Sequence, residues 1–210
     1  FDPHLEGVLE LLARARSQGG DPWLRIGAWT HLGWRGGLDQ LQLDFFRQAL
    51  GVAQAPSAPK LLLQCQRSHR WMGASASPLP QDQGRAGGPT EELVWGLRST
   101  GLAAIRPDEG QLLAGSCGAG LVVLVHDPWR PAPGVAGHLA QGDGLDDRAG
   151  LDARSDVVCF QTPPLAEALL LQGRPLLRIT AAADQPGFDL VATLAVVTAS
   201  GAVRQLSLGV

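Results

Sequence analysis

The sequence has too few cysteines for a disulfide framework or a structural zinc site. Its three cysteines, Cys65, Cys117 and Cys159, are odd in number, widely spaced and form no C-x-x-C pair. Disulfide-rich domains and zinc sites need several cysteines at short, regular spacings. Cys65 and Cys159 fall in apolar segments, where we expect them to be buried. This cysteine usage fits a reducing compartment, and we expect a cytoplasmic location rather than a secreted one.

Charge and hydropathy argue against two classes of partner. The net charge is −3, and no run of lysine or arginine occurs, so we expect no nucleic acid and no anionic lipid surface as a partner. No apolar stretch approaches the length of a membrane span, so we expect no contact with a membrane. The 210 residues suffice for one large domain or two small ones. Because the chain begins at Phe1, we expect it to be an internal piece of a longer protein.

Several catalytic and cofactor motifs are missing. The sequence has no G-x-S-x-G, no H-E-x-x-H, no Walker-type loop and no dinucleotide fingerprint. The glycine-rich segment at 115–120 is not followed by a predicted helix that could receive a phosphate. His126, Asp127 and His138 match no standard metal spacing. We therefore expect neither a metal nor a cofactor.

The first fifty residues alternate between helix and strand. Apolar residues at helical spacing predict a helix from Leu5 that ends at Gly19-Gly20, and a second helix from about 37 to 50. Between them, residues 23–28 predict a short buried strand. This alternation is typical of an α/β sheet. The Pro- and Ser-rich segment 54–59 marks a boundary, which predicts domains at 1–53 and 54–210.

The remainder of the chain predicts an all-β sandwich. Short apolar segments alternate with turn residues rich in glycine and proline, a pattern typical of sandwich domains. The predicted strands are 60–65, 92–98, 121–125, 156–160, 168–172, 174–182, 188–198 and 202–208. A long glycine- and aspartate-rich connection runs from 131 to 153. The whole chain is therefore expected to be mainly β with two helices near its start, and its β domain to be truncated.

An aspartate and a histidine stand where an α/β sheet places catalytic side chains. His31 follows the predicted strand 23–28, and active sites of open α/β sheets lie at the carboxyl ends of strands. Asp2 precedes it by one helix and one strand, in the acid-then-histidine order of α/β-hydrolases. In such a triad the carboxylate orients the imidazole, which takes the serine proton. Two other interpretations stay open: Asp2 as a helix N-cap, and His31 as a loop histidine with local hydrogen bonds.

Short segments along the chain match one protein family in order. The segments are FDP at 1–3, GAWTH at 27–31, LDFFRQALG at 43–51, RW at 70–71, HDP at 126–128, RSDVVCFQTPPL at 154–165 and GFDLVA at 187–192. Together they resemble the cocaine esterase / X-Pro dipeptidyl-peptidase family of serine hydrolases. The sequence departs from the family at Pro3, where the family has glycine, and at Ala28, where it has proline.

The resemblance implies a fold and a set of functional residues. It implies the end of an α/β-hydrolase domain followed by a jelly roll that walls the active-site cleft. It also implies that Asp2 is the catalytic acid, that His31 is the catalytic base, and that His138 and Leu139 lie in a wall-forming segment. The nucleophilic serine and an oxyanion-hole tyrosine would lie upstream, since this sequence contains no tyrosine. The implied substrates are small-molecule esters, amides or peptides, and the chain alone is expected to be inactive. The sequence leaves the oligomeric state open, with a homo-oligomer as one alternative.

A second interpretation makes the chain a binding module. Jelly rolls often bind sugars, and tryptophan rings stack on them. Trp71, Trp95 and Trp129 are the candidate stacking residues, although core packing and loop anchoring would also account for all three. In a binding module Asp2 and His31 would be dispensable.

Overall fold

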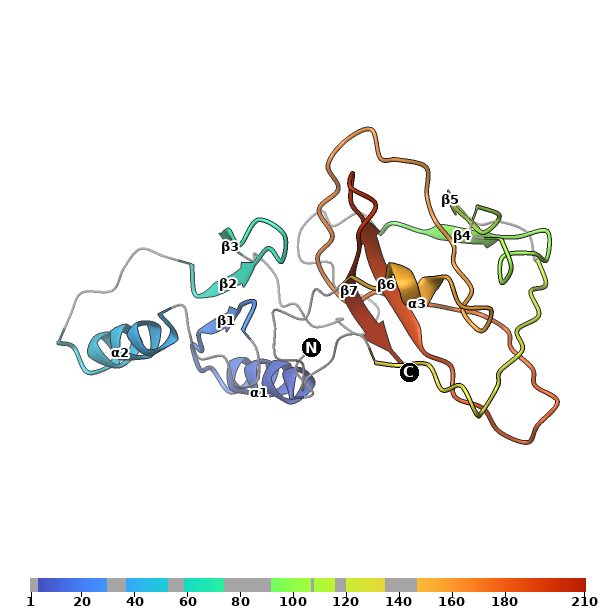
Figure 1. The fold of residues 1–210 in the computed structure, drawn as a ribbon. Coiled ribbons are helices and arrows are strands. Elements are labelled where there is room, and N and C mark those ends of the chain that lie inside the picture. Colours follow the sequence, from blue (N-terminus) through green and yellow to red (C-terminus); the bar gives the residue numbers. More distant parts are fainter. Residues whose placement is uncertain are drawn as a thin grey trace.

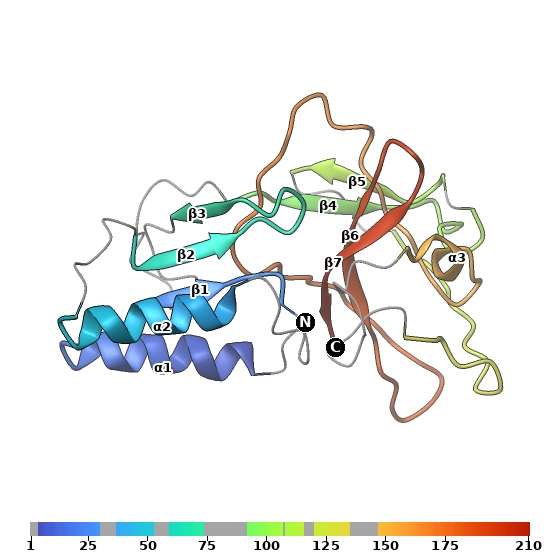
Figure 2. The same cartoon turned by 60° about the vertical axis from the view of Figure 1, so that its left-hand side comes forward.

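Helices and small sheets make up two parts of the molecule. The computed structural model describes residues 4–29, 37–52, 59–73, 92–106, 108–115, 120–134 and 147–210. Within these ranges the chain forms three helices and seven strands, and the strands lie in three small sheets. Figures 1 and 2 show the first two helices with one sheet on one side, and a β-rich part on the other.

Helix α1 (Leu5–Ser17) has one apolar face and a defined end. Leu9 and Leu12, which recur at helical spacing, are its buried residues. The helix ends where Gly19 adopts a left-handed conformation with φ of 78°, which glycine adopts without steric cost. The backbone N–H of Gly20 then donates to the Ala15 carbonyl at 2.9 Å. The predicted helix and its termination at Gly19-Gly20 are confirmed.

The first sheet contains both parallel and antiparallel pairs. Strand β1 (Leu24–Ile26) runs parallel to β2 (Leu61–Gln64), and β3 (Trp71–Gly73) is antiparallel to β2. Helix α2 (Leu38–Ala49) lies in the connection between β1 and β2, as the alternation of helix and strand predicts. This sheet includes residues on both sides of the boundary predicted at 54–59.

A small apolar core joins α1 to the parallel pair. Leu9 and Leu12 of α1 pack against Leu24 of β1 and Leu61 of β2, each no more than 9% exposed. Helix α2 contacts the start of β1 differently, through an edge-to-face pair of Phe45 and Trp23 with ring centroids 5.6 Å apart. Burial of these leucines therefore fixes α1 on the sheet, which sets the position of the strands it covers.

The β-rich part consists of two antiparallel pairs. Strand β4 (Trp95–Arg98) pairs with β5 (Gln111–Ala114), and β6 (Ala192–Val197) pairs with β7 (Val203–Gly209). The β6–β7 register shifts between Leu194 and Ala195, the position of a β-bulge. A single turn of helix, α3 (Ala149–Asp152), lies beside this pair (Figure 1).

A buried polar network fastens α3 to β7. The Arg148 guanidinium donates to Gln205 Oε1 at 3.0 Å and to Asp152 Oδ1 at 2.9 Å. Asp147 accepts hydrogen bonds from the backbone N–H groups of Val203 and Ala149. Because Arg148 and Gln205 are 8% and 2% exposed, their polar groups need these partners. The network thus replaces the apolar contacts that a four-residue helix cannot make.

Several predicted strands are absent from the part of the chain that the structure describes. Residues 121–125, 168–172 and 174–182 form no ladder there, 156–160 is followed only by an isolated bridge of Gln161 to Gln111, and the strand predicted at 188–198 shortens to β6. These segments are extended, and residues 160–190 run around the hairpins as long loops (Figures 1 and 2). An extended segment becomes a strand only where a second backbone lies about 4.8 Å away to share hydrogen bonds. Apolar composition predicts the extension but not the partner.

Candidate functional site

The carboxyl ends of β1 and β2 lie side by side. Because the two strands are parallel and Ile26 pairs with Leu63, the residues that follow each strand leave the sheet at the same end. Those residues are Gly27 to Trp29 after β1, here called the 27–29 segment, and Gln64 and Cys65 on the β2 side. Open α/β sheets hold their ligands at this end of parallel strands.

A glutamine side chain connects the two strand ends. Gln64 Oε1 accepts a hydrogen bond from the backbone N–H of Ala28 at 2.9 Å. Its Nε2 donates to the His69 carbonyl oxygen, also at 2.9 Å. The amide is therefore held at both ends, and it fixes the 27–29 segment to the turn that follows β2.

Two indole rings pack at the same place. The rings of Trp29 and Trp71 have centroids 5.6 Å apart and planes inclined by 46°. Gly27 lies against both: a Cβ atom there would be 3.0 Å from Trp71 Cη2 and 3.1 Å from the Trp29 ring. A side chain at position 27 would therefore require these rings to shift by a few tenths of an ångström.

The turn after β2 carries a cysteine with an altered pKa. The backbone of Cys65 donates to the Arg70 carbonyl and accepts from the His69 N–H, both at 2.9 Å. A hydrogen bond from the Ser68 side chain lowers the pKa of the Cys65 thiol. Cys65 lies just outside β2 and is only partly buried, so the expectation of a buried strand cysteine is wrong.

A second polar cluster lies in the β-rich part. Arg154 binds Asp156 through two hydrogen bonds, from Nε to Oδ1 at 2.7 Å and from Nη2 to Oδ2 at 2.6 Å. Arg154 Nη2 also donates to the Arg130 carbonyl at 2.5 Å. The two bonds to Asp156 hold the Arg154 side chain in place. The bond to the Arg130 carbonyl joins the segment at 154–156 to the turn at 127–130.

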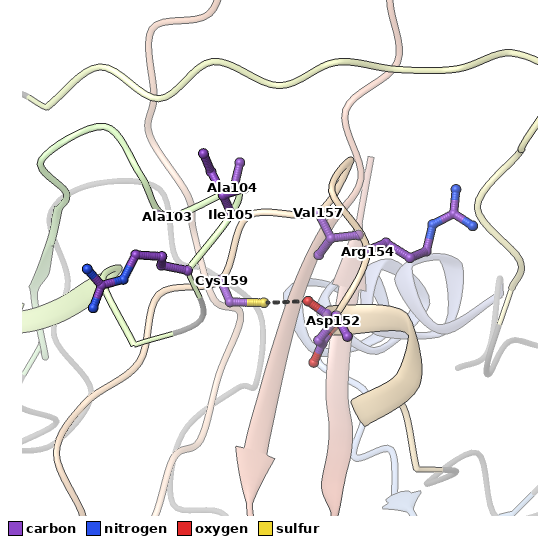
Figure 3. A pocket seen from close by; sticks show the side chains of 9 residues that line it. Ala103, Ala104, Ile105, Asp152, Arg154, Val157 and Cys159 are labelled. Atoms are coloured by element: carbon purple, nitrogen blue, oxygen red, sulfur yellow. Dashed lines mark hydrogen bonds between the residues drawn. The ribbon is translucent and has the colours of Figure 1, made fainter.

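A pocket beside this cluster contains Cys159. Figure 3 shows the Cys159 thiol directed at Asp152, and its Sγ lies 3.7 Å from the Asp152 carbonyl oxygen. Burial raises the pKa of this thiol, and the charge of Asp152 raises it further. A raised pKa favours the protonated thiol, which is a weaker nucleophile than the thiolate. Cys159 lies outside any strand and is only partly buried, which corrects the expectation of full burial.

The match to a known protein family covers the β-rich part and the strands at the sheet end from β2 onward. A family model of the X-Pro dipeptidyl-peptidase C-terminal non-catalytic domain matches residues 59–210, which are 152 of the 210 residues. The chain belongs to this family. The resemblance seen in the sequence is thereby confirmed. No curated protein and no solved structure matches the chain.

Membership in this family shows which of the residues described above belong to the non-catalytic domain. The family is one of serine hydrolases, and the matched domain is its non-catalytic one. The match begins at Pro59, so Gln64 and Trp71 belong to the non-catalytic domain, whereas the 27–29 segment precedes it.

The four residues predicted for the active site lie outside the described ranges. Asp2, His31, His138 and Leu139 are all in this group, so their roles stay predictions. The neighbouring elements are informative for Asp2. The N-cap position of α1 is occupied by His4, so the alternative in which Asp2 is the N-cap residue of that helix is not supported.

The described part of the chain contains neither a candidate metal cluster nor a membrane-spanning helix. Among the residues with described positions, no three side chains of His, Cys, Asp or Glu gather closely enough to bind a metal ion. None of the helices described is both long enough and apolar enough to cross a bilayer.

We expect Asp156 to make stability depend on pH. The hydrogen bonds from Arg154 are the main cause that lowers the pKa of this carboxyl. A group with a lowered folded pKa stabilises the fold above its unfolded pKa, about 3.9, and that contribution is lost as the pH falls further. Asp156→Asn should therefore flatten the dependence of unfolding free energy on pH between about 4 and 2.

The chain supplies a matched control for this measurement. Arg106 and Asp108 have the same spacing, but their side chains are 60% and 70% exposed, against 20% and 10% for Arg154 and Asp156. A hydrogen bond from Arg106 also lowers the pKa of the Asp108 carboxyl, but solvent screens an exposed pair, which contributes little to stability. Asp108→Asn should therefore flatten the pH dependence less than Asp156→Asn does. Equal effects of the two substitutions would show that the Arg154 pair has no special role.

Proposed function

We propose that this chain is the C-terminal part of a serine hydrolase in which Asp2 is the catalytic acid and His31 is the catalytic base. Residues 1–53 would form the end of the α/β-hydrolase domain, and residues 54–210 a jelly-roll domain that walls the cleft. The nucleophilic serine would come from a segment outside these 210 residues. The substrates would be small esters, amides or peptides.

The observation that carries the proposal is the parallel pairing of β1 and β2. The 27–29 segment leaves the sheet at the carboxyl end of this pair, and the sequence reaches His31 two residues later. A histidine that follows a parallel strand at this end is placed as the α/β-hydrolase triad requires. Membership in a serine hydrolase family supports the same role.

The position of the β-rich part supports its role as a wall. In both views β2 points toward that part (Figures 1 and 2). Gln66, just beyond β2, donates to the Leu206 carbonyl of β7 at 3.4 Å, and Glu6 of α1 forms an ion pair with Arg174. We propose that the active-site cleft lies between the sheet end and this part. We propose that His138 and Leu139 contribute to the same wall.

The proposed mechanism uses the two residues in separate roles. His31 would take the proton of the serine hydroxyl as the serine oxygen attacks the substrate carbonyl, and would then give that proton to the leaving group. Water would release the acyl group by the same two proton transfers. Asp2 would hold the imidazole in the correct tautomer and stabilise its protonated form.

The isolated chain should be inactive. Residues 1–210 would lack the nucleophile, so we expect no turnover of p-nitrophenyl acetate above the buffer rate. The full-length hydrolase that contains them should turn the ester over. Circular dichroism of the isolated chain would establish that α1 and α2 are folded. If the isolated chain hydrolysed the ester, and His31→Ala removed that activity, the proposed location of the serine would be wrong.

A further inference from the structure

We propose that Gln64 and Trp71 are positioning residues for the catalytic histidine. Both belong to the domain matched as non-catalytic, which begins at Pro59, yet both contact the 27–29 segment that leads into His31. The inference rests on the proposed role of His31. It gives the non-catalytic domain a direct part in the geometry of the active site.

Gln64 holds the backbone of the 27–29 segment. Its Oε1 is the acceptor for the Ala28 N–H, and its Nε2 is a donor to the His69 carbonyl, with both distances 2.9 Å. The amide has one acceptor oxygen and a donor nitrogen, so the two contacts use opposite ends of one rigid group. A side chain without an acceptor oxygen would leave the Ala28 N–H without this partner.

Trp71 holds the side of the same segment. Its ring packs on Trp29 with centroids 5.6 Å apart, and Gly27 lets the two rings approach the backbone closely. Trp71 is 38% exposed, so it is not a core residue whose removal would leave a large cavity. We therefore interpret its contact with Trp29 as one that fixes the position of the 27–29 segment, and not only as one that stabilises the fold.

The short distance along the chain couples this anchor to His31. His31 follows Trp29 by two residues, and each residue spans at most about 3.6 Å. Because only Thr30 lies between Trp29 and His31, we expect a shift of the segment to displace the imidazole. Displacement of a catalytic group by about 1 Å can lower a rate about a hundredfold.

The test compares variants of the full-length hydrolase with p-nitrophenyl acetate as the substrate. We expect Gln64→Met and Trp71→Ala to lower kcat by about ten- to a hundredfold while KM changes by less than about twofold. The acidic limb of the kcat/KM profile, which reports the free imidazole, should move to lower pH. A displaced imidazole loses the stabilisation of its protonated form by Asp2, and this lowers its pKa.

A conservative variant separates positioning from folding. Trp71→Phe keeps an aromatic ring that can pack on Trp29, so we expect it to retain most of the activity that Trp71→Ala loses. Matched controls are Gln111→Met, on the exposed side of β5, and Phe188→Ala, at an aromatic residue that is 53% exposed. Neither control should change kcat or the acidic limb.

The outcomes distinguish this inference from the proposed function. If His31→Ala abolishes turnover but Gln64→Met and Trp71→Ala behave like their controls, the positioning role is wrong and the proposed function stands. A fall in kcat with an unmoved acidic limb and no recovery in Trp71→Phe would also overturn it, because a partly unfolded enzyme gives that result. If His31→Ala keeps full activity, both proposals fail.

Discussion

Replacing Gly110 by alanine is expected to destabilise the protein by about 3 kcal/mol or more, because overpacking against backbone atoms cannot be relieved by a rotamer change. A Cβ atom at Gly110 would be 1.9 Å from the Cys159 carbonyl oxygen and 3.0 Å from its carbonyl carbon. It would also meet Ala103, which is 3% exposed, at 3.2 Å. The two backbones would have to separate.

Hydrogen bonds hold these two backbones together. The Gln161 N–H donates to the Gly110 carbonyl at 3.1 Å, and the Leu112 N–H donates to the Gln161 carbonyl at 2.9 Å. Separation would therefore break the contact of β5 with the segment at 159–161, in addition to the steric cost. The clash therefore cannot be relieved while these hydrogen bonds are kept.

Urea unfolding of Gly110→Ala and Gly134→Ala would measure the effect. A Cβ atom at Gly134 would meet nothing within 4 Å, so this control should keep the wild-type midpoint. We expect the Gly110 variant to unfold at a much lower urea concentration, or to be unfolded without urea. A midpoint equal to that of the control would show that the two backbones are not closely packed at this point.

The helices could be predicted from the sequence because their signals are local. Leu9 and Leu12 recur at helical spacing, and Gly19 and Gly51 take left-handed conformations where α1 and α2 end. The periodicity and the glycine need no information about the remainder of the chain. Strands β1 and β2 were also predicted, since each is a short apolar run next to turn residues.

The elements that the sequence did not predict depend on distant partners. Strand β5 has only four residues and forms where it meets β4, and β3 forms on β2 in the same way. Helix α3 lies in a glycine- and aspartate-rich connection and is held by Arg148, which reaches Gln205 of β7. No local pattern marks these positions, because their stability comes from tertiary contacts.

The same distinction applies to the candidate site. Asp2 and His31 were predicted from their order along the chain and from the family resemblance. Gln64 was not, since a glutamine at the end of a strand carries no recognisable signal. Trp71 was noted as part of a family landmark and as a candidate for sugar stacking, but its contact with Trp29 depends on how β3 pairs with β2.

The largest functional effect is expected for His31→Ala. In a serine hydrolase the imidazole accepts the serine proton and returns it to the leaving group, and an alanine can do neither. Loss of a triad histidine lowers kcat by about 10⁴- to 10⁶-fold in enzymes of this type, with little change in KM. We expect a fall of this size in the full-length hydrolase. His126→Ala, an exposed histidine outside the proposed site, should leave turnover unchanged.

Turnover of p-nitrophenyl acetate by the full-length hydrolase, wild type against His31→Ala, tests the central claim most directly. The account predicts that kcat falls by at least about 10⁴-fold while circular dichroism and the thermal midpoint stay as in the wild type. Unchanged turnover in a folded His31→Ala variant would contradict it. The family would then contribute only its scaffold to this protein, and a ligand-binding role for the β-rich part would become the better explanation.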